Sequence, residues 1–348
     1  MAEVLTSSAT SYFLSGTSAF SYLLERCHIP REGVVLLPAF TCERLLLPLF
    51  ARHQRYRLVD NHPSWVTPEL DQYQAAYSKE TAAIVLIYIW GYAPRDLEAI
   101  IDWARSKRLL IIEDVASALG LSKDGRPFGS MGDMSFGSFG YDKTWELGGG
   151  GFCSGPKLQR EKSTRGIGRI TSRYNSLIKL GRRLGSFTAR QLLLKSVALS
   201  SNGSLMPSTQ VGQMIRDAIP HIGQSFVASM SKRLASTNEL LEAGTGFRGG
   251  QESTFSFIVP NNDQRIAVRL LAELQDRDTV LKMLRRAKVW VGTDYAYPLD
   301  HWVLPGTTPN AHRLGRNVLS FITNERNQSV DACIQKLNER FLGEQRQA

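Results

Sequence analysis

Three short apolar runs, separated by stretches with helical periodicity, constrain the fold of this chain most. The runs cover residues 34–37, 84–89 and 109–112, and each is apolar throughout, as in strands that are buried on both faces. Between the last two runs, apolar residues recur at helical spacing from 97 to 104. A strand, a helix and a strand in this order predict a parallel α/β sheet that is covered by helices.

Turn residues and charge then predict how the chain continues. Residues 122–133 contain an Asp-Gly pair between polar flanks, which indicates a β-hairpin, and residues 133–139 continue as a strand. After about residue 155 the sequence is basic and mostly helical. A loop is expected at 200–210, and a further helix over 226–244 that a glycine ends.

A second, smaller domain is expected from about residue 250. We therefore predict a large α/β domain over residues 1–245 and a small C-terminal α+β domain over residues 246–348. The elements predicted for the small domain are a strand at 253–260, a helix at 267–277, a strand at 288–292 and a final helix at 329–341.

The net charge of +10 comes from one segment. Between residues 157 and 195 there are eleven Lys or Arg residues and a single Glu, which accounts for the whole excess. Such a segment could bind nucleic acid, an anionic membrane surface or a diphosphate-bearing substrate, or it could be a solvated helical face. Its only aromatic residues are Tyr174 and Phe187, which argues against stacking on single-stranded nucleic acid.

Composition disfavours several other classes of protein. Apolar residues make up 43% of the chain, and the longest apolar runs are far shorter than a membrane span. We therefore expect a globular cytoplasmic protein without integral membrane contact. The four cysteines have no paired spacing and the histidines do not cluster with them, so we expect free thiols and no metal site.

Two candidate site segments follow from position alone. Asp114 comes directly after the run at 109–112, and ligands in open α/β sheets bind outside the carboxyl ends of parallel strands. Its carboxylate could bind a metal, act as an acid or base, hold a buried cation or cap a helix. Gly16, Thr17 and Ser18 begin an amphipathic helix, where backbone N–H groups and hydroxyls can bind phosphate or simply cap the helix.

Lys143 is a third candidate because it stands among small and aromatic residues and is followed by four consecutive glycines. An amine in apolar surroundings is partly neutral and can add to a carbonyl to form a Schiff base. Ser138 lies five residues earlier and offers a further hydroxyl. A lysine, a carboxylate and phosphate-binding donors are what pyridoxal 5'-phosphate (PLP) requires.

These motifs resemble those of the DegT/DnrJ/StrS aminotransferases, PLP enzymes of fold type I that mostly aminate keto sugars attached to nucleotides. The resemblance spans most of the chain. It rests on "GTSA" (16–19), "PAFTC" (38–42), "YIWGYAPRDLEAI" (88–100), "IIEDVASALG" (111–120), "KDGRPFGSMGD" (123–133), "FGSFGYDKTWELGGGG" (136–151), "YAYPLDHW" (295–302) and "HRLGRNVLSF" (312–321).

The resemblance implies an aspartate-aminotransferase-like large domain with a mostly parallel central sheet, and PLP as the cofactor. Lys143 would form the Schiff base with the cofactor, and Asp114 would hold its pyridinium nitrogen. Contacts to the cofactor's phosphate are implied at Gly16, Thr17, Ser18 and Ser138.

The chain departs from the family pattern at several cofactor positions. Ser117 stands where a longer glutamine or histidine usually lies beside the cofactor's phenolic oxygen. Cys42 stands where an aromatic residue usually covers the ring, which leaves Phe40 as an alternative stacking residue. The usual segment whose asparagine reaches the partner subunit's phosphate is replaced by the basic segment 157–195, with Asn175 as the candidate counterpart.

The resemblance predicts a homodimeric aminotransferase that takes its amino group from an amino acid, glutamate in the first place. The acceptor would be a keto sugar, nucleotide-linked, in the biosynthesis of a cell-surface polysaccharide or a secondary metabolite. One alternative keeps the fold and cofactor but uses a non-nucleotide ketone or a lipid-linked sugar. Another is a non-catalytic protein that binds nucleic acid or a membrane, against which the retained Lys143 argues.

Overall fold

A computed structural model describes most of the first 158 residues and much of the C-terminal part. Within the gaps lie Asn175, nearly all of the basic segment 157–195, the loop predicted at 200–210 and the helix predicted at 329–341, so these predictions fall outside the described residues. The described residues are 5, 9–140, 143–156, 158, 213, 228–242, 255–274, 277–286, 291–293, 295, 298–303 and 306–323.

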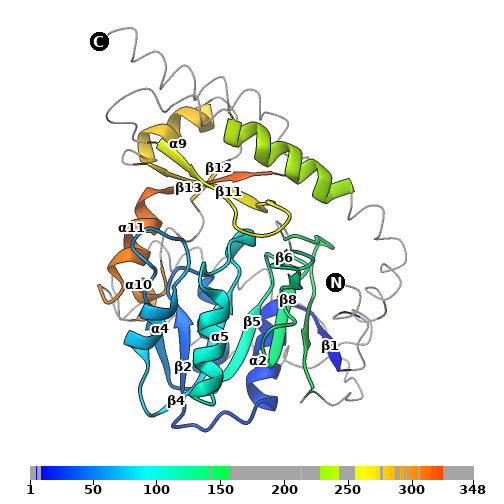
Figure 1. Cartoon of the computed structure of the whole chain (residues 1–348), viewed down its shortest axis with the longest axis vertical. Helices are drawn as coiled ribbons and strands as arrows, with labels where there is room; N and C mark the ends of the chain where they lie inside the picture. The colour runs from blue at the N-terminus through cyan, green and yellow to red at the C-terminus, as the bar shows by residue number, and fades with distance from the viewer. Residues whose placement is uncertain are drawn as a thin grey trace.

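A seven-stranded, mostly parallel sheet forms the centre of the N-terminal part (Figure 1). Strands β2, β3, β4, β5 and β8 run parallel to one another, and β9 and β1 complete one edge with antiparallel pairs. This confirms the predicted sheet. In spatial order the strands are β1 (Thr10–Phe13), β9 (Gly151–Ser154), β8 (Met134–Ser138), β5 (Leu110–Asp114), β4 (Thr81–Ile87), β2 (Val34–Pro38) and β3 (Tyr56–Val59).

Helices cover both faces of this sheet because alternate residues of each strand point to opposite sides. Leu36 and Ile84 pack in one core with helices α4 (Leu70–Ala76) and α5 (Leu97–Ser106), which lie in front of the sheet in Figure 1. Val35 and Val85 pack in a second core with helices α2 (Gly16–Arg26) and α3 (Leu46–Ala51). Burial on both faces explains why the strand sequences are apolar throughout.

Two short helical turns and a hairpin connect these elements. The turns are the 3-10 helices η1 (Glu43–Leu45), after β2, and η2 (Ile89–Gly91), after β4. The hairpin pairs β6 (Ser122–Lys123) with β7 (Arg126–Pro127). At its tip Asp124 and Gly125 have φ values of 52° and 72°, the left-handed pair that a two-residue Asp-Gly turn requires. The hairpin prediction is confirmed.

A four-stranded antiparallel sheet forms the C-terminal part. Its strands lie above the central sheet in Figure 1, and a helix over residues 228–242 and α9 lie along it. In spatial order the strands are β10 (Phe255–Ile258), β11 (Arg269–Leu274), β13 (Val318–Ile322) and β12 (Val291–Gly292). The remaining helices are α9 (Arg277–Arg286), α10 (Leu299–Val303) and α11 (Pro309–Asn317).

The helix predicted over 267–277 is wrong, because residues 269–274 form strand β11. This strand pairs with β10 on one side and β13 on the other, and Leu270, Leu271 and Ala272 are fully buried. Pairing and burial on both sides outweigh the high helix propensity of this leucine-rich sequence. The helix begins later, at Arg277.

Several hydrogen bonds hold the small sheet over the carboxyl ends of the central strands. The hydroxyl of Tyr92, just after η2, donates to the carbonyl of Ile258 at 2.7 Å and accepts from the amide of Leu271 at 3.2 Å. Asn261 forms two hydrogen bonds with the backbone of Ala93, at 3.0 and 2.9 Å. The predicted boundary between residues 245 and 246 stays a prediction, because the chain around it is not described.

Across the described part of the chain, none of the helices has both the length and the apolar character that a bilayer span requires. Within the same residues, no group of three or more His, Cys, Asp or Glu side chains could hold a metal ion.

Candidate active site

The candidate site lies where β5 and β8 end. Asp114 is the last residue of β5 and Ser138 the last residue of β8, and the two strands are paired in parallel up to Asp114 and Phe136. Lys143 follows β8 by five residues. The fold therefore gathers these three predicted residues at one edge of the sheet, as the rule for ligand sites in α/β proteins expects.

The amine of Lys143 points to the segment that follows β5. Its Nζ atom donates a hydrogen bond to the hydroxyl oxygen of Ser117 at 3.2 Å. Ser117 is buried and Lys143 is half-buried. Ser117 was predicted as a cofactor contact; the structure adds that it orients the lysine side chain.

The carboxyl group of Asp114 is buried close to the same amine. Burial raises its pKa from 3.8 to about 6, and the amide of Ala116, which donates to Oδ1 at 2.9 Å, and the positive charge of Lys143 oppose this rise. A carboxylate that has lost this much hydration binds a cation strongly. The site is therefore suited to a protonated ring nitrogen.

The start of helix α2 lies against the end of β8. Ser15 caps the helix, since its hydroxyl accepts the amide hydrogen of Ser18 at 3.1 Å and lies 2.9 Å from the Ser18 hydroxyl. A Cβ atom on Gly16 would lie 3.0 Å from that of Ser138. Glycine therefore lets the helix start approach the strand end closely. Thr17 is half-buried at the first turn.

The glycines after Lys143 bring strand β9 against this helix start. Gly148 and Gly150 have φ values of 78° and 98°, which other residues rarely adopt. Gly150 forms a parallel bridge with Ser15, and a Cβ atom on Gly151 would lie 2.5 Å from the amide nitrogen of Gly16. The close approach leaves no room for a side chain at Gly151, and the positive φ values favour glycine at 148 and 150, whereas Gly149 has open space around it.

Ser138 has contacts of its own at the strand end. Its hydroxyl oxygen accepts a hydrogen bond from the amide of Gly140 at 3.2 Å and lies 3.5 Å from the carbonyl oxygen of Gly150. The hydroxyl is half-buried and next to the start of α2. Backbone amides and hydroxyls at a helix start are the donors that a phosphate group prefers.

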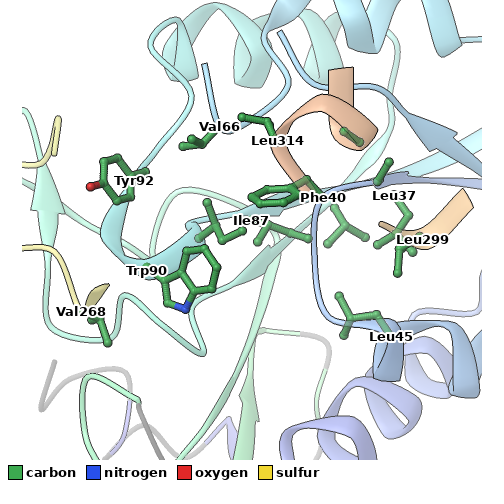
Figure 2. Close-up of a cluster of buried hydrophobic side chains, with 14 of the residues drawn as sticks. Leu37, Phe40, Leu45, Val66, Ile87, Trp90, Tyr92, Val268, Leu299 and Leu314 are labelled. Atoms are coloured by element: carbon green, nitrogen blue, oxygen red, sulfur yellow. The ribbon is translucent and has the colours of Figure 1, made fainter. Parts of the chain in front are cut away.

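Cys42 and Phe40 occupy different surroundings. Burial and the neighbouring Glu43 raise the pKa of the Cys42 thiol, whereas the positive charges of Arg44 and Lys143 lower it in part. The thiol therefore lies near the amine of Lys143. Phe40 is buried in the core shown in Figure 2, edge-on to Trp90 at 6.4 Å between ring centroids. Phe40 thus contributes to the core, and its stacking on a cofactor ring stays a prediction.

Sequence reasoning did not single out three residues around the site. Ser15, next to the predicted helix start, is the actual cap, and its place before Gly16 could have indicated this. Trp90 has a φ value of 50° and stacks on Tyr295 at 4.7 Å, beside Phe40. Arg233 reaches the backbone of Lys143 from the helix over 228–242, and nothing in the sequence pattern indicates this contact.

Comparison with known proteins agrees with this geometry. Residues 3–164 match the sequence model of the DegT/DnrJ/EryC1/StrS aminotransferase family. The match covers just under half of the chain, so its N-terminal part resembles this family. The matched residues include every strand of the central sheet and the site residues Asp114, Ser138 and Lys143.

Several curated proteins resemble parts of this chain. The chain is 30% identical over 146 residues to a dTDP-4-dehydro-2,3,6-trideoxy-D-glucose 4-aminotransferase from Saccharopolyspora spinosa, covering 41% of this chain and 38% of that protein. It is 39% identical over 144 residues to a GDP-perosamine synthase from Escherichia coli O157:H7, covering 39% and 37%. An L-glutamine:scyllo-inosose aminotransferase from Streptomyces griseus is 25% identical over 228 residues, covering 62% and 54%. The chain thus matches about two-fifths of the first two relatives and about half of the third.

Several solved structures share the fold over nearly the whole chain. S. venezuelae DesV superposes with a TM-score of 0.72 at 20% identity, covering 95% of this chain and 84% of that one. The aminotransferase TlmJ from Streptoalloteichus hindustanus gives a TM-score of 0.71 at 18% identity, covering 98% and 89%. The chain therefore has the fold of the PLP aminotransferases of fold type I, as predicted.

DegT-family aminotransferases use PLP, and the described residues fit this cofactor. Lys143 supplies an amine beside a hydroxyl, and Asp114 supplies a buried carboxylate. The hydroxyls of Ser18 and Ser138 lie at or next to the start of α2, where a helix favours a phosphate group. Asn175, the candidate contact across a dimer interface, lies outside the described residues.

Proposed function

We propose that the protein is a PLP-dependent aminotransferase that moves an amino group from an amino acid, glutamate in the first place, to a keto sugar carried on a nucleotide. One observation carries this proposal. The amine of Lys143 contacts Ser117 and is close enough to the buried carboxyl of Asp114 to lower its pKa, and the pair lies beside the glycine-lined start of α2. The nucleotide-sugar aminotransferases among the relatives support the choice of acceptor.

PLP, when bound, supplies an aldehyde that takes up the amine and a ring that accepts the electron pair released from the substrate carbon. Asp114, ionised at neutral pH, would hold the positive charge on the ring nitrogen, for which its buried carboxylate is suited. Ser18, Ser138 and the amides at the start of α2 would bind the phosphate.

Lys143 would also move the proton that the transfer requires. Its Nζ atom takes the proton from the Cα atom of the donor amino acid, and it later returns a proton to the carbon that receives the amine. The hydroxyl of Ser117 accepts a hydrogen bond from Nζ and so limits the directions in which the amine can point. This restriction favours proton transfer at one face of the substrate.

The test is a mass-spectrometric screen of the full chain with PLP and glutamate against a panel of keto sugar nucleotides. We expect an aminated product with at least one of them. Borohydride treatment of the PLP-loaded protein should leave a stable adduct that peptide mapping finds on Lys143. The exposed Lys107 provides the matched control.

The two lysine variants decide the assignment. Lys143→Ala should form neither adduct nor product, while Lys107→Ala should form both as the wild type does. Product formation at the wild-type rate by Lys143→Ala would contradict the assignment, as would an adduct on another lysine.

A second candidate has the same site but another acceptor. The relative that matches the largest part of this chain among those described above carries the name of an enzyme acting on scyllo-inosose, a ketone without a nucleotide, with glutamine as the donor. Ser117 and Cys42 also depart from the usual family pattern at the cofactor. A panel of free cyclic ketones with glutamine tests this candidate; turnover of these and none of the sugar nucleotides would favour it.

A homodimer in the cytoplasm remains part of the proposal. Sedimentation of the PLP-loaded protein tests the dimer, and cell fractionation tests the location. Partners other than donor, acceptor and a second copy are not required. The basic segment 157–195 would contact the diphosphate of a nucleotide substrate.

A further inference from the structure

Arg233 is a buried arginine that joins the loop of Lys143 to the small sheet. It lies on the helix over 228–242 and is 3% exposed. Its Nη2 atom donates to the carbonyl oxygen of Lys143 at 3.3 Å. Its Nη1 atom donates to the carbonyl oxygen of Val268 at 3.0 Å and to the hydroxyl of Thr323 at 3.2 Å. One guanidinium therefore contacts three segments that are far apart in the sequence.

The acceptors on the small-sheet side are themselves fixed. The hydroxyl of Thr323 is fully buried and lies 2.6 Å from the carbonyl oxygen of Ala267 and 3.0 Å from that of Val268. The amide of Val268 donates to the carbonyl oxygen of Trp90 at 2.9 Å. Residues at the start of β11 and the end of β13 thus hold the guanidinium of Arg233 in place. From this position it donates to the carbonyl oxygen of Lys143.

A buried guanidinium imposes geometry on the groups that it contacts. Its N–H groups form a rigid planar fork, so two acceptors on different nitrogens fix its orientation and position. Burying this charge is costly unless its hydrogen bonds are made, and so each acceptor is held firmly. The carbonyl of Lys143 is one of these acceptors, and its position sets where the side chain of Lys143 begins.

We infer that Arg233 is a positioning residue for Lys143, an inference that rests on the function proposed above. By fixing the backbone carbonyl of Lys143 it directs the side chain toward Ser117 and Asp114. It also makes the position of the amine depend on the docking of the small sheet. Arg233 does not touch the reacting atoms, so its effect should appear in reaction rates rather than in the binding of substrates.

The test uses the full chain and follows the formation of the covalent link between PLP and Lys143. In that step the amine nitrogen bonds to the aldehyde carbon and water leaves, and borohydride then adds a hydride to the same carbon. The variants are Arg233→Lys, which keeps the charge but not the planar fork, and Arg233→Met. The matched control is Thr323→Val, which removes an acceptor of the same guanidinium and leaves the contact with Lys143 intact.

We expect both Arg233 variants to slow adduct formation at Lys143 and to lower kcat by about tenfold or more, because a misplacement of less than 1 Å is costly at a reacting centre. The KM of the amino donor should change less than about twofold, because Arg233 makes no contact with the substrate that would strengthen its binding. Thr323→Val should lower the melting temperature but slow adduct formation by no more than about threefold, because the carbonyl oxygens of Val268 and Lys143 still hold the guanidinium.

Three results would overturn the inference. One is adduct formation at the wild-type rate in Arg233→Met; another is an equal loss of rate in Thr323→Val. The third is failure of both Arg233 variants to fold at 10 °C, which would assign Arg233 to stability alone. A wild type that forms no adduct at Lys143 would instead contradict the proposed function, so the two failures are distinguishable.

Discussion

The amine of Lys143 lies 3.2 Å from the hydroxyl oxygen of Ser117, although 26 residues separate them in the chain. The pair exists because parallel strands β5 and β8 end side by side. Removing the hydroxyl with Ser117→Ala leaves the amine free to adopt other directions, and we expect kcat to fall by about tenfold, the worth of one hydrogen bond to a charged group. Steady-state kinetics would measure this.

Ser130→Ala is the control for Ser117→Ala, since the Ser130 hydroxyl contacts only the nearby carbonyl of Pro127 among the bonds described for it. Its kinetics should match the wild type. An unchanged kcat in Ser117→Ala would show that Ser117 does not orient the lysine.

Gly16→Ala should weaken PLP binding. The new methyl group would lie 3.0 Å from the Cβ atom of Ser138 and 3.1 Å from the carbonyl oxygen of Gly137, so the helix start must move away from the strand end. Because the phosphate donors move with it, we expect PLP affinity to fall by about tenfold or more, with a loss of about 1–3 kcal/mol in stability. Gly149→Ala, which meets no atom within 4 Å, should bind PLP normally in the same titration.

Asp114 should make the PLP-free protein less stable as the pH rises from about 4 to about 6. Burial raises its pKa from 3.8 to about 6, so the folded state binds the proton more tightly than the unfolded state does. The contribution of this group to the free energy of unfolding falls across that range and does not change further at higher pH. Asp114→Asn lacks the ionisation, and its Oδ1 atom can still accept from Ala116.

We therefore expect Asp114→Asn without PLP to be more stable than the wild type by up to about 3 kcal/mol at pH 7, with a difference of less than about 1 kcal/mol at pH 4. Urea unfolding at both pH values measures this. The same variant should lose aminotransferase activity. A lower stability than the wild type at pH 7 would contradict the prediction.

Glu113 should be required for folding stability rather than for chemistry. It is fully buried and accepts hydrogen bonds from the Tyr88 hydroxyl at 2.6 Å and from three backbone amides, those of Gly129, Met131 and Gly132. Glu113→Ala leaves these donors without a partner, and we expect a loss of about 3 kcal/mol or more. Glu98→Ala, which breaks an exposed pair with Arg126, should cost no more than about 1 kcal/mol. Thermal and urea unfolding compare the two.

The sequence predicted the central sheet and the position of Asp114, Ser138 and Lys143 because these depend on local patterns. Buried parallel strands are apolar along their whole length, and ligand-binding residues follow their ends. The Asp-Gly turn at 124 and 125 was predictable for the same reason, since both residues must adopt positive φ values.

Features that depend on distant partners were not predictable. Strand β11 has a leucine-rich sequence that suits a helix, and only its two neighbouring strands make it extended. Arg233 resembles any basic residue of an amphipathic helix until the small sheet and the Lys143 loop surround it. The packing of Phe40 against Trp90 and Tyr295 was not predictable either, because these neighbours come from other parts of the chain, and its stacking on a cofactor ring stays a prediction.

The pairing of β1 with β9 also sets the order in which the protein can assemble during synthesis. Thr10 and Ser154 are 144 residues apart, yet their hydroxyls form a hydrogen bond at 2.9 Å. Strand β1 therefore leaves the ribosome long before β9 exists, and contacts of such long range form slowly. Because β9 also holds the glycines against the start of α2, the site cannot be complete until residue 154 has been made and has reached the edge of the sheet.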